Sequence, residues 1–308
     1  MQCPICGQST DGRVTARHLP GFFRCPHCSG YFHEEGSPPP YEEGYFAAAS
    51  QPSLLSKGLG KVLKIFLWTR KRCVKRTVGA NKSAEILDYG CGNGKLVRYL
   101  RQHGFKVDGF DPSAAAVALA RQADLPVFSD IPHKKYDLIM FWHSLEHTDT
   151  PLSDLGGLLK HLKPDGQLLI AVPNGDSLEA YLTRGRWFCY DWPFHRVHFT
   201  PRALRGLLEQ VGCKVQWFDF VNMEYTISSL MQSFLNTILP KNTLYSVVSN
   251  RRMPGAGTKI VFFGLLSLGL LTIFSPLILF FFLIALVSRR TAAMIVVAKI
   301  RSPNHLIT

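Results

Sequence analysis

A short segment near residue 90 carries residues whose types and spacing could do chemistry. An apolar run ends in Asp88, and glycines then occupy the alternate positions Gly90, Gly92 and Gly94 before an apolar helical pattern begins. This order predicts a buried parallel strand, a tight loop and a helix. Glycine lets the backbone adopt positive φ and lets a ligand approach the main chain closely. The segment 86–96 is therefore predicted to bind a ligand at the end of a strand.

The glycine spacing distinguishes two kinds of ligand-binding loop. A dinucleotide-binding fold prefers G-x-G-x-x-G, and its third glycine would fall where this chain has Lys95. The observed D-x-G-x-G-x-G instead resembles motif I of the class I S-adenosylmethionine (SAM) dependent methyltransferases; another Rossmann-type ligand is the alternative. The resemblance implies SAM as the cofactor. It assigns four loop residues to SAM binding: Gly90, Cys91, Gly92 and Gly94.

The residues after the loop follow the order of the same family. Residues 106–111 read as a strand that ends in Asp111, about twenty residues past the loop, where an acid can accept hydrogen bonds from both ribose hydroxyls. Pro112 follows, is also expected among the SAM-binding residues, and opens a helix. The resemblance covers residues 84–220 and a last strand at 293–300. It implies an α/β fold, a Rossmann-like doubly wound sheet of seven strands.

Two further acids are expected near the cofactor. Asp88 ends the first strand, so it is predicted to orient the loop or to contact the amino end of SAM. Asp130 comes after the third strand and is expected near the adenine, since ligands of this fold lie at the carboxyl ends of the strands.

A histidine segment follows the fourth strand. Residues 143–147 resemble the Glu-x-x-Glu-His segment of polyprenyl-quinone O-methyltransferases, with His143 in place of the first glutamate. His147 is a candidate general base, because imidazole titrates near neutrality. The alternative is that Glu146 and His147 brace the loop through local hydrogen bonds. The replaced glutamate leaves open whether a metal or a general base is used.

An aromatic segment at 187–201 follows the fifth strand. It contains two more candidate bases, His195 and His198, and it ends in Thr200-Pro201, a helix start. Its aromatic side chains suit an amphiphilic or ring-bearing acceptor; a packed loop with both histidines bonded to backbone is the alternative. The acceptor pocket is predicted to consist of Trp142, His143, Trp187, Tyr190 and Trp192.

Four cysteines near the N-terminus form two C-x-x-C pairs: Cys3 with Cys6, and Cys25 with Cys28. Four thiolates at this spacing predict a closed, structural Zn²⁺ site rather than a catalytic one. A pair of redox dithiols is the alternative. A zinc ribbon placed before a methyltransferase domain, as expected here, resembles the arrangement of some sugar C-methyltransferases.

Charge and hydropathy point to a membrane surface. The chain has 35 basic and 22 acidic residues, a net charge of +13, which favours an anionic partner. Residues 52–78 predict a basic amphipathic helix, either interfacial or packed on the domain. Residues 260–287 contain no charged side chain. Because predicted neighbouring strands flank this segment, two short helices at 260–273 and 276–288 are expected to form a re-entrant or interfacial hairpin, rather than a single span or a buried helix pair.

The expected protein is a membrane-associated SAM-dependent methyltransferase whose catalytic domain lies on the cytoplasmic face. Its acceptor is predicted to be lipid-linked or amphiphilic, such as a polyprenyl quinone precursor or a lipid-linked sugar or glycan. The alternatives are a soluble nucleotide sugar or another small metabolite as acceptor, or a non-catalytic SAM-binding scaffold. Nucleic acid is disfavoured because no Asn/Asp-Pro-Pro-Tyr segment follows the fourth strand. The expected organisation is a zinc ribbon at 1–36, a linker at 37–51, the basic helix at 52–78, a methyltransferase domain at 79–222 and 291–301, and an insertion at 223–290 that contains the hairpin at 260–288.

Overall fold

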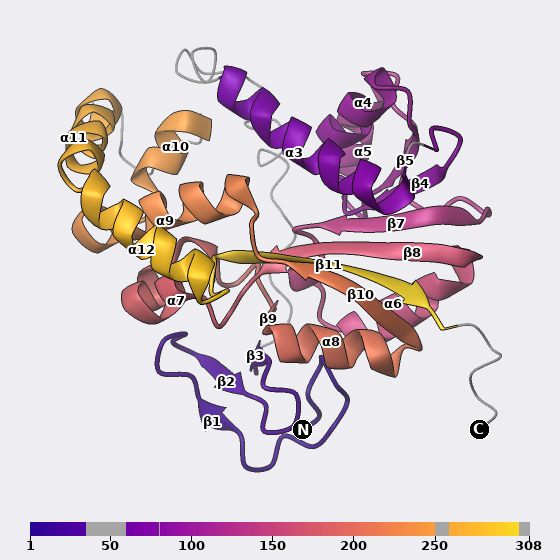
Figure 1. Cartoon of the computed structure of the whole chain (residues 1–308), viewed down its shortest axis with the longest axis horizontal. Coiled ribbons are helices and arrows are strands. Elements are labelled where there is room, and N and C mark those ends of the chain that lie inside the picture. The colour runs from indigo at the N-terminus through magenta and orange to yellow at the C-terminus, as the bar shows by residue number, and fades with distance from the viewer. Residues whose placement is uncertain (35–59, 80, 250–258, 302–308) are drawn as a thin grey trace.

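A seven-stranded mixed sheet forms the centre of the protein (Figure 1). The structure is a computed structural model that describes residues 1–34, 60–79, 81–249 and 259–301. The strand order is β10-β11-β8-β7-β4-β5-β6. β11 pairs antiparallel with both β10 and β8, and the other described pairs are parallel. The predicted α/β sheet is confirmed, including the last two strands as neighbours. The strands are β4 (Glu85–Tyr89), β5 (Lys106–Phe110), β6 (Val127–Phe128), β7 (Tyr136–Trp142), β8 (Leu162–Pro173), β10 (Cys213–Asp219) and β11 (Ala293–Ile300).

Helices cover both faces of this sheet because its central strands are apolar on both sides. On one face, α3 (Gly60–Val78) and α4 (Lys95–Gln102) pack against Ile86 and Leu138. On the other face, α6 (Pro151–Leu158) and α8 (Pro201–Gln210) pack against Leu87 and Ile139. The remaining elements of this body are α5 (Ala114–Arg121), α7 (Leu178–Thr183) and the short 3-10 helices η1 (Leu145–His147), η2 (Leu159–His161), η3 (Arg184–Arg186) and η4 (Phe188–Tyr190).

The cysteine-rich N-terminus belongs to a second sheet. Its strands β1 (Val14–Thr15), β2 (Phe22–Arg24) and β3 (Tyr31–His33) are joined by β9 (Val197–His198), which lies in the aromatic segment after β8. A Cβ at Gly30 would lie 2.4 Å from Ile5 and 3.1 Å from Ala203 of α8, so the module sits closely on the main body. The N-terminal module and the predicted acceptor loop are therefore parts of one structure.

The insertion between β10 and β11 is helical. It contains α9 (Met223–Ile238), α10 (Thr243–Ser249), α11 (Lys259–Ile273) and α12 (Ser275–Val287). The expected pair of short helices is confirmed, and it breaks at Phe274 with a bend of 68°. No single helix in the described ranges is long and apolar enough to cross a bilayer; α11 and α12 reach that length and composition only as a bent pair.

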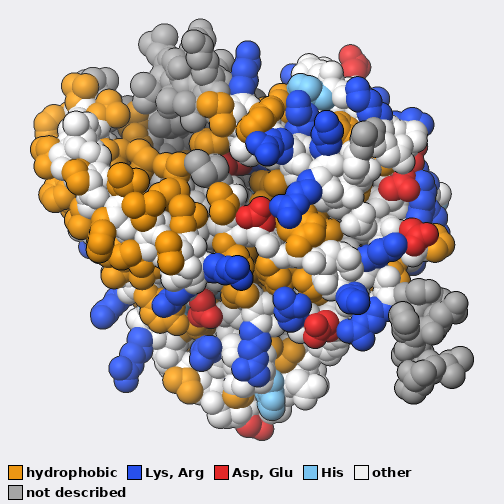
Figure 2. Space-filling model, in the orientation of Figure 1, with side chains coloured by type: hydrophobic (Ala, Val, Ile, Leu, Met, Phe, Trp, Pro, Cys, Tyr) orange, Lys and Arg blue, Asp and Glu red, His pale blue; other side chains and the backbone are white. Residues whose placement is uncertain are grey.

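Much of α11 and α12 exposes large apolar side chains to the outside of the protein. Figure 2 shows these hydrophobic groups gathered over the two helices on the face drawn there. On α12, Phe280, Leu283 and Val287 recur at helical spacing, and Val287 is 88% exposed. Contiguous apolar surface of this kind is uncommon on soluble monomers and marks an interaction site. The exposed set on α11 includes Phe262, Leu265, Leu268 and Ile273.

The basic helix packs on the domain over its described part. Val74 is fully buried, and Leu67 and Val78 pack beside it on the sheet, as the domain-packing alternative expected. Ile65 and Trp68 remain exposed on the outer side of α3. The predicted linker at 37–51 and residues 52–59 of the predicted helix lie outside the described residues.

Candidate functional site

The glycine loop after β4 has the backbone that its sequence predicts. Gly90, Gly92 and Gly94 have φ values of 76°, 57° and 74°, which side-chain-bearing residues rarely adopt. A Cβ at Gly90 would lie 2.5 Å from Cβ of Ser144, so the loop also passes very close to the end of β7. The amide of Gly90 donates to the carbonyl of Phe110 at the end of β5. Glycine is thus required here both for conformation and for space.

Asp111 joins this loop to the end of β5. Its Oδ2 accepts from the amide of Gly92 at 2.7 Å, and its Oδ1 accepts from the amide of Ser113 at 2.9 Å. Ser113 caps α5, whereas Pro112 is exposed between the two. Burial raises the pKa of Asp111, and the two amide hydrogen bonds oppose that rise. A carboxylate anchored at this edge can also accept from a ribose diol, as SAM binding requires.

Asp88 lies beneath the loop at the end of β4 and is 2% exposed. Burial raises its pKa to about 7, although the charge of Arg70 acts in the opposite direction and Asp111 adds to the rise. Arg70 comes from α3 and is held by Glu224 of α9 through two hydrogen bonds, at 2.8 and 2.5 Å. A cationic ligand group beside Asp88 would favour the ionised carboxylate.

Cys91 and Asp130, which were also predicted to bind the cofactor, differ in their surroundings. The Cys91 side chain points toward β5, since a Cβ at Gly109 would lie 2.5 Å from its Sγ. The backbone amide of Cys91, by contrast, donates to Phe110 in the loop. Asp130 is exposed after β6, where it accepts from the hydroxyl of Ser129 at 3.3 Å. The glycine cradle and the anchored Asp111 therefore fit SAM, whereas no contact joins Asp130 to the cradle among the described residues.

The end of β7 brings buried polar groups next to this cradle. His143 has a φ of 54°, stacks on Tyr225 of α9 with ring centroids 3.5 Å apart, and has a pKa lowered to about 3 by burial. Its Nδ1 lies 3.3 Å from Oε1 of Glu146. Glu146 is fully buried, and neither of its oxygens accepts a hydrogen bond among the described residues. The indole NH of Trp142 is buried without a partner in the same part of the chain.

The three predicted histidine bases lie together. His147 and His195 have ring centroids 4.8 Å apart, and His195 and His198 are 5.7 Å apart. Nδ1 of His147 lies 3.0 Å from the carbonyl of Phe194, and Nδ1 of His195 lies 2.7 Å from the carbonyl of Cys189. Each contact assigns the proton to Nδ1 and leaves Nε2 as the basic nitrogen. Burial lowers the pKa of all three, which favours neutral imidazoles.

This cluster can also act as a ligand set. One ligand atom each from Glu146, His147 and His195 lies within 4.8 Å of the others. Two imidazoles and one carboxylate are a common donor set for divalent transition metals. The same atoms can serve as a proton acceptor and its electrostatic partner, so the geometry permits either chemistry.

The aromatic segment is tied to the N-terminal module. Trp187 is 2% exposed and donates its indole NH to Glu179, so it is a core residue of this segment. The hydroxyl of Tyr190 donates to the carbonyl of Pro20 at 2.6 Å. Trp192 stacks on His33 of β3 with centroids 3.7 Å apart. These contacts fix the loop that carries His195 and His198.

The four predicted metal ligands converge in the N-terminal module. Sγ of Cys3 lies 3.8 Å from that of Cys28, and Sγ of Cys6 lies 3.8 Å from that of Cys25. All four sulfurs lie within 4.8 Å of one another, and none forms a disulfide. A tetrahedron with Zn–S bonds of about 2.3 Å has edges of about 3.8 Å. The donor set and its spacing therefore fit a structural zinc ion.

Sequence reasoning missed the contacts that α9 makes with the site. Tyr225 stacks on His143, and Glu224 holds Arg70 near Asp88. Glu224 and Arg70 are 154 positions apart in the chain, and no local pattern signals their pairing. The acid at Glu224 in the first turn of a helix is ordinary by itself, because acids are favoured there.

A family model matches the part of the chain that contains the glycine cradle. Residues 68–216 match the model of a family described as a methyltransferase domain. The match runs from α3 through the glycine loop and Asp111 into β10. Residues 68–216 are therefore similar to a methyltransferase domain, and their glycine cradle fits SAM.

Particular relatives lie among oxygen methyltransferases. The chain is 32% identical over 164 residues to the malonyl-[acyl-carrier protein] O-methyltransferase of Enterobacter lignolyticus, covering 49% of this chain and 64% of that protein. It is 27% identical over 122 residues to the ubiquinone biosynthesis O-methyltransferase of Alkalilimnicola ehrlichii, covering 35% and 49%. The chain thus spans less than two thirds of the length of either relative.

A solved structure agrees at the level of fold. A candidate sarcosine dimethylglycine methyltransferase from Galdieria sulphuraria aligns with a TM-score of 0.51 and 14% sequence identity. The alignment covers 84% of this chain and 97% of that one. At this identity the likeness concerns the fold alone.

Proposed function

We propose that this protein transfers the methyl group of SAM to a lipid-linked or amphiphilic acceptor at the cytoplasmic face of a membrane. The glycine cradle with Asp111 supports the cofactor, and the O-methyltransferase relatives support an oxygen acceptor. The observation that carries the acceptor class is the exposed apolar surface of α11 and α12 on the same body. A polyprenyl quinone precursor and a lipid-linked sugar both have the required combination of an apolar chain and a hydroxyl.

The membrane proposal rests on shape and charge together. Two short helices with apolar outer faces can lie in the headgroup region without crossing the bilayer. Arg289 is exposed directly after α12, where a cation can meet anionic lipid. The exposed Trp68 of α3 suits the same interface, because indole rings favour that depth.

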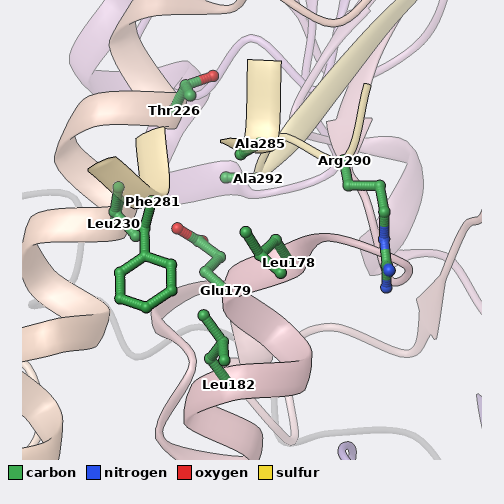
Figure 3. A pocket seen from close by; sticks show the side chains of 9 residues that line it. All are labelled: Leu178, Glu179, Leu182, Thr226, Leu230, Phe281, Ala285, Arg290 and Ala292. Atoms are coloured by element: carbon green, nitrogen blue, oxygen red, sulfur yellow. The ribbon is translucent and has the colours of Figure 1, made fainter. Parts of the chain in front are cut away.

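The apolar helices are packed against the catalytic body. A pocket between α7, α9 and α12 is lined by Leu178, Leu182 and Phe281 around the carboxyl group of Glu179 (Figure 3). Glu179 accepts hydrogen bonds from Ser229 and from Trp187. A surface bound to lipid through α12 would therefore be connected to the aromatic segment that carries the histidines.

Each group of site residues has a separate role in the proposed methyl transfer. SAM supplies an electrophilic methyl group when it is bound. Asp111 and the loop would orient it, and the buried histidine cluster would orient an acceptor hydroxyl and take its proton. Nε2 of His195 is the proposed proton acceptor, since its Nδ1 bonds to a backbone carbonyl. We further propose that Zn²⁺ bound by Cys3, Cys6, Cys25 and Cys28 stabilises the N-terminal sheet.

Methyl transfer to extracted lipid tests this function. Detergent-purified protein is first titrated with SAM by calorimetry beside Asp111→Ala and a control on β5, Asp108→Asn, whose carboxylate pairs with Lys134. Binding by the wild type and the control, with at least about tenfold weaker binding by Asp111→Ala, is expected. SAM carrying a labelled methyl group is then supplied with membrane lipid, and label is expected in the organic phase.

The two steps separate the parts of the proposal. If label enters an added nucleotide sugar and none enters lipid, the protein is a methyltransferase with a soluble acceptor. SAM binding without transfer of label to any acceptor would favour the scaffold, and failure of the wild type to bind SAM would refute the enzyme.

A further inference from the structure

A second cavity lies between the N-terminal module and α7. Its volume is about 290 Å³, near the lower end of the range for small-molecule sites. The walls come from β1, β2 and β3 and from Tyr181 of α7. Among the described residues that line it are Arg17, Arg24 and His18, with no carboxylate. We call this cavity the arginine groove.

The cations of the arginine groove are not neutralised by local ion pairs. Within the described part of the chain, neither Arg17 nor Arg24 pairs with an acid, whereas Arg13 of the same module pairs with Glu34. Arg290 adds a further charge beside the groove, with its guanidinium 4.8 Å from the ring centre of Tyr181. The surroundings therefore favour an anion.

Aromatic side chains form one wall of the groove and bond to the neighbouring Asp176. His18 stacks on Tyr181 with ring centroids 3.8 Å apart, and its Nε2 lies 3.1 Å from the carbonyl of Gly175. Asp176 accepts from the hydroxyl of Tyr31 at 2.7 Å and from that of Tyr181 at 3.4 Å. These tyrosine bonds engage one oxygen of Asp176, so part of its charge is compensated beside the two arginines.

A strand register connects the arginine groove to the histidine cluster. Arg24 lies opposite Val14 on one side and opposite Tyr31 on the other, and Tyr31 lies opposite His198. Residues directly opposite in antiparallel strands share a face of the sheet. The groove and His198 therefore occupy one face of the same small sheet.

From this arrangement we infer that the arginine groove binds a phosphate or diphosphate group. Guanidinium groups form paired hydrogen bonds with phosphate oxygens, and two arginines match the charge of a diphosphate better than that of a neutral ligand. α7 presents Tyr181 to the groove and Leu182 to the pocket against α12. A phosphorylated head group in the groove would thus lie near apolar surface that suits a hydrocarbon chain. Use of the groove by the methyl acceptor rests on the proposed function; the binding of phosphoryl groups does not.

Titration with inorganic pyrophosphate tests the groove without any acceptor. The double variant Arg17→Gln/Arg24→Gln is compared with Arg13→Gln, which removes a paired cation of the same module. We expect the wild type and Arg13→Gln to bind alike, and the double variant to bind at least about tenfold more weakly. Equal binding by all three proteins, or no binding by the wild type at millimolar pyrophosphate, would overturn the inference.

Vesicles distinguish the source of the phosphoryl group. Neutral phosphatidylcholine vesicles are prepared with and without a polyprenyl diphosphate. If the diphosphate increases binding of the wild type to vesicles and the double variant lacks this increase, the groove binds a lipid-borne head group. If the wild type binds pyrophosphate but the diphosphate does not increase vesicle binding, the groove binds a soluble ligand. SAM titration of the same proteins keeps the two proposals apart, because the groove variants are expected to bind SAM normally.

Discussion

Tyr31 on β3 lies directly opposite His198 on β9, and this pair joins the cysteine module to the predicted acceptor loop. The two short strands bond to each other although they are far apart in sequence. Cys28 is three positions before Tyr31, and His195 is three positions before His198. A metal ion held by the cysteines would therefore stabilise the position of the histidine cluster as well as its own loops.

Removal of one cysteine ligand should weaken the acceptor site more than the SAM site. Cys3→Ser is expected to lower bound zinc from about one ion per chain to near zero, because a structural site needs its full ligand set. Methyl transfer should fall at least about tenfold, while SAM binding stays within about twofold, since the glycine loop is held by hydrogen bonds to Phe110 and Asp111. Metal analysis, calorimetry and a transfer assay measure these effects. Cys73→Ser is the control, and unchanged zinc in Cys3→Ser would refute the site.

SAM affinity should rise with pH through the titration of Asp88. Burial raises the pKa of this carboxyl to about 7, so its ionised fraction grows between about pH 6 and pH 8. A cationic SAM binds better to the ionised form, and several-fold tighter binding is expected across that range. Calorimetry at three pH values measures it. Asp88→Asn should bind weakly without this pH dependence, and Asp108→Asn should retain it; a sloping profile in Asp88→Asn would contradict the assignment.

Stability should fall as pH rises through the titration of Glu179. Burial raises its folded pKa to about 8, above that of an unfolded glutamate, so the folded state retains a proton that the unfolded state releases above about pH 4.3. Between those values the free energy of unfolding should decline by on the order of a few kcal/mol. Glu179→Gln should flatten this decline in urea titrations at pH 5 and pH 8. The exposed Glu209→Gln should follow the wild type, and an unchanged slope in Glu179→Gln would exclude this cause.

Charges on the outer face of α12 should reduce membrane binding. Phe280 and Leu283 are 56% and 51% exposed, so their replacement should leave the fold intact. Burial of such a side chain in lipid contributes about 1.5–3 kcal/mol. Phe280→Glu/Leu283→Glu should therefore lower partition into anionic vesicles by at least about tenfold in a flotation assay. Gln102→Glu, on the distant α4, is the charge control; equal flotation of both variants would count against α12 as the contact.

The sequence was most informative where local pattern decides structure. Apolar runs that end in Asp88 and Asp111 predicted two neighbouring strands, and the glycines between them predicted the loop. Pro276 predicted a break between two short helices, and the break lies at Phe274. A proline at the start of a helix ends the one before it, so this boundary is encoded locally.

Other features depend on contacts between distant segments. The two residues of β9 are too few for a strand signal, and their partner β3 lies in another module. Arg70 read as part of a basic stretch, yet it is buried against Glu224 near the cofactor cradle. The convergence of Glu146 with His195 depends on the return of a long aromatic loop. Such pairings join residues that are distant in sequence, and hydrophobic periodicity reports only on local structure.

The insertion leaves the sheet after Asp219 and returns at Ala293, and these two ends belong to neighbouring antiparallel strands. In the simplest form of such a sheet, a tight turn would join them. α9 bonds to the main body through Glu224 and Ser229, and α10, α11 and α12 pack on α9. Phe281 of α12 also lies beside α7, and Tyr245 of α10 lies beside Phe188. An ancestor could therefore have gained or lost the apolar helices at a single hairpin turn without shifting any strand. The membrane affinity proposed for these helices would then be able to change in evolution while the sheet stayed the same.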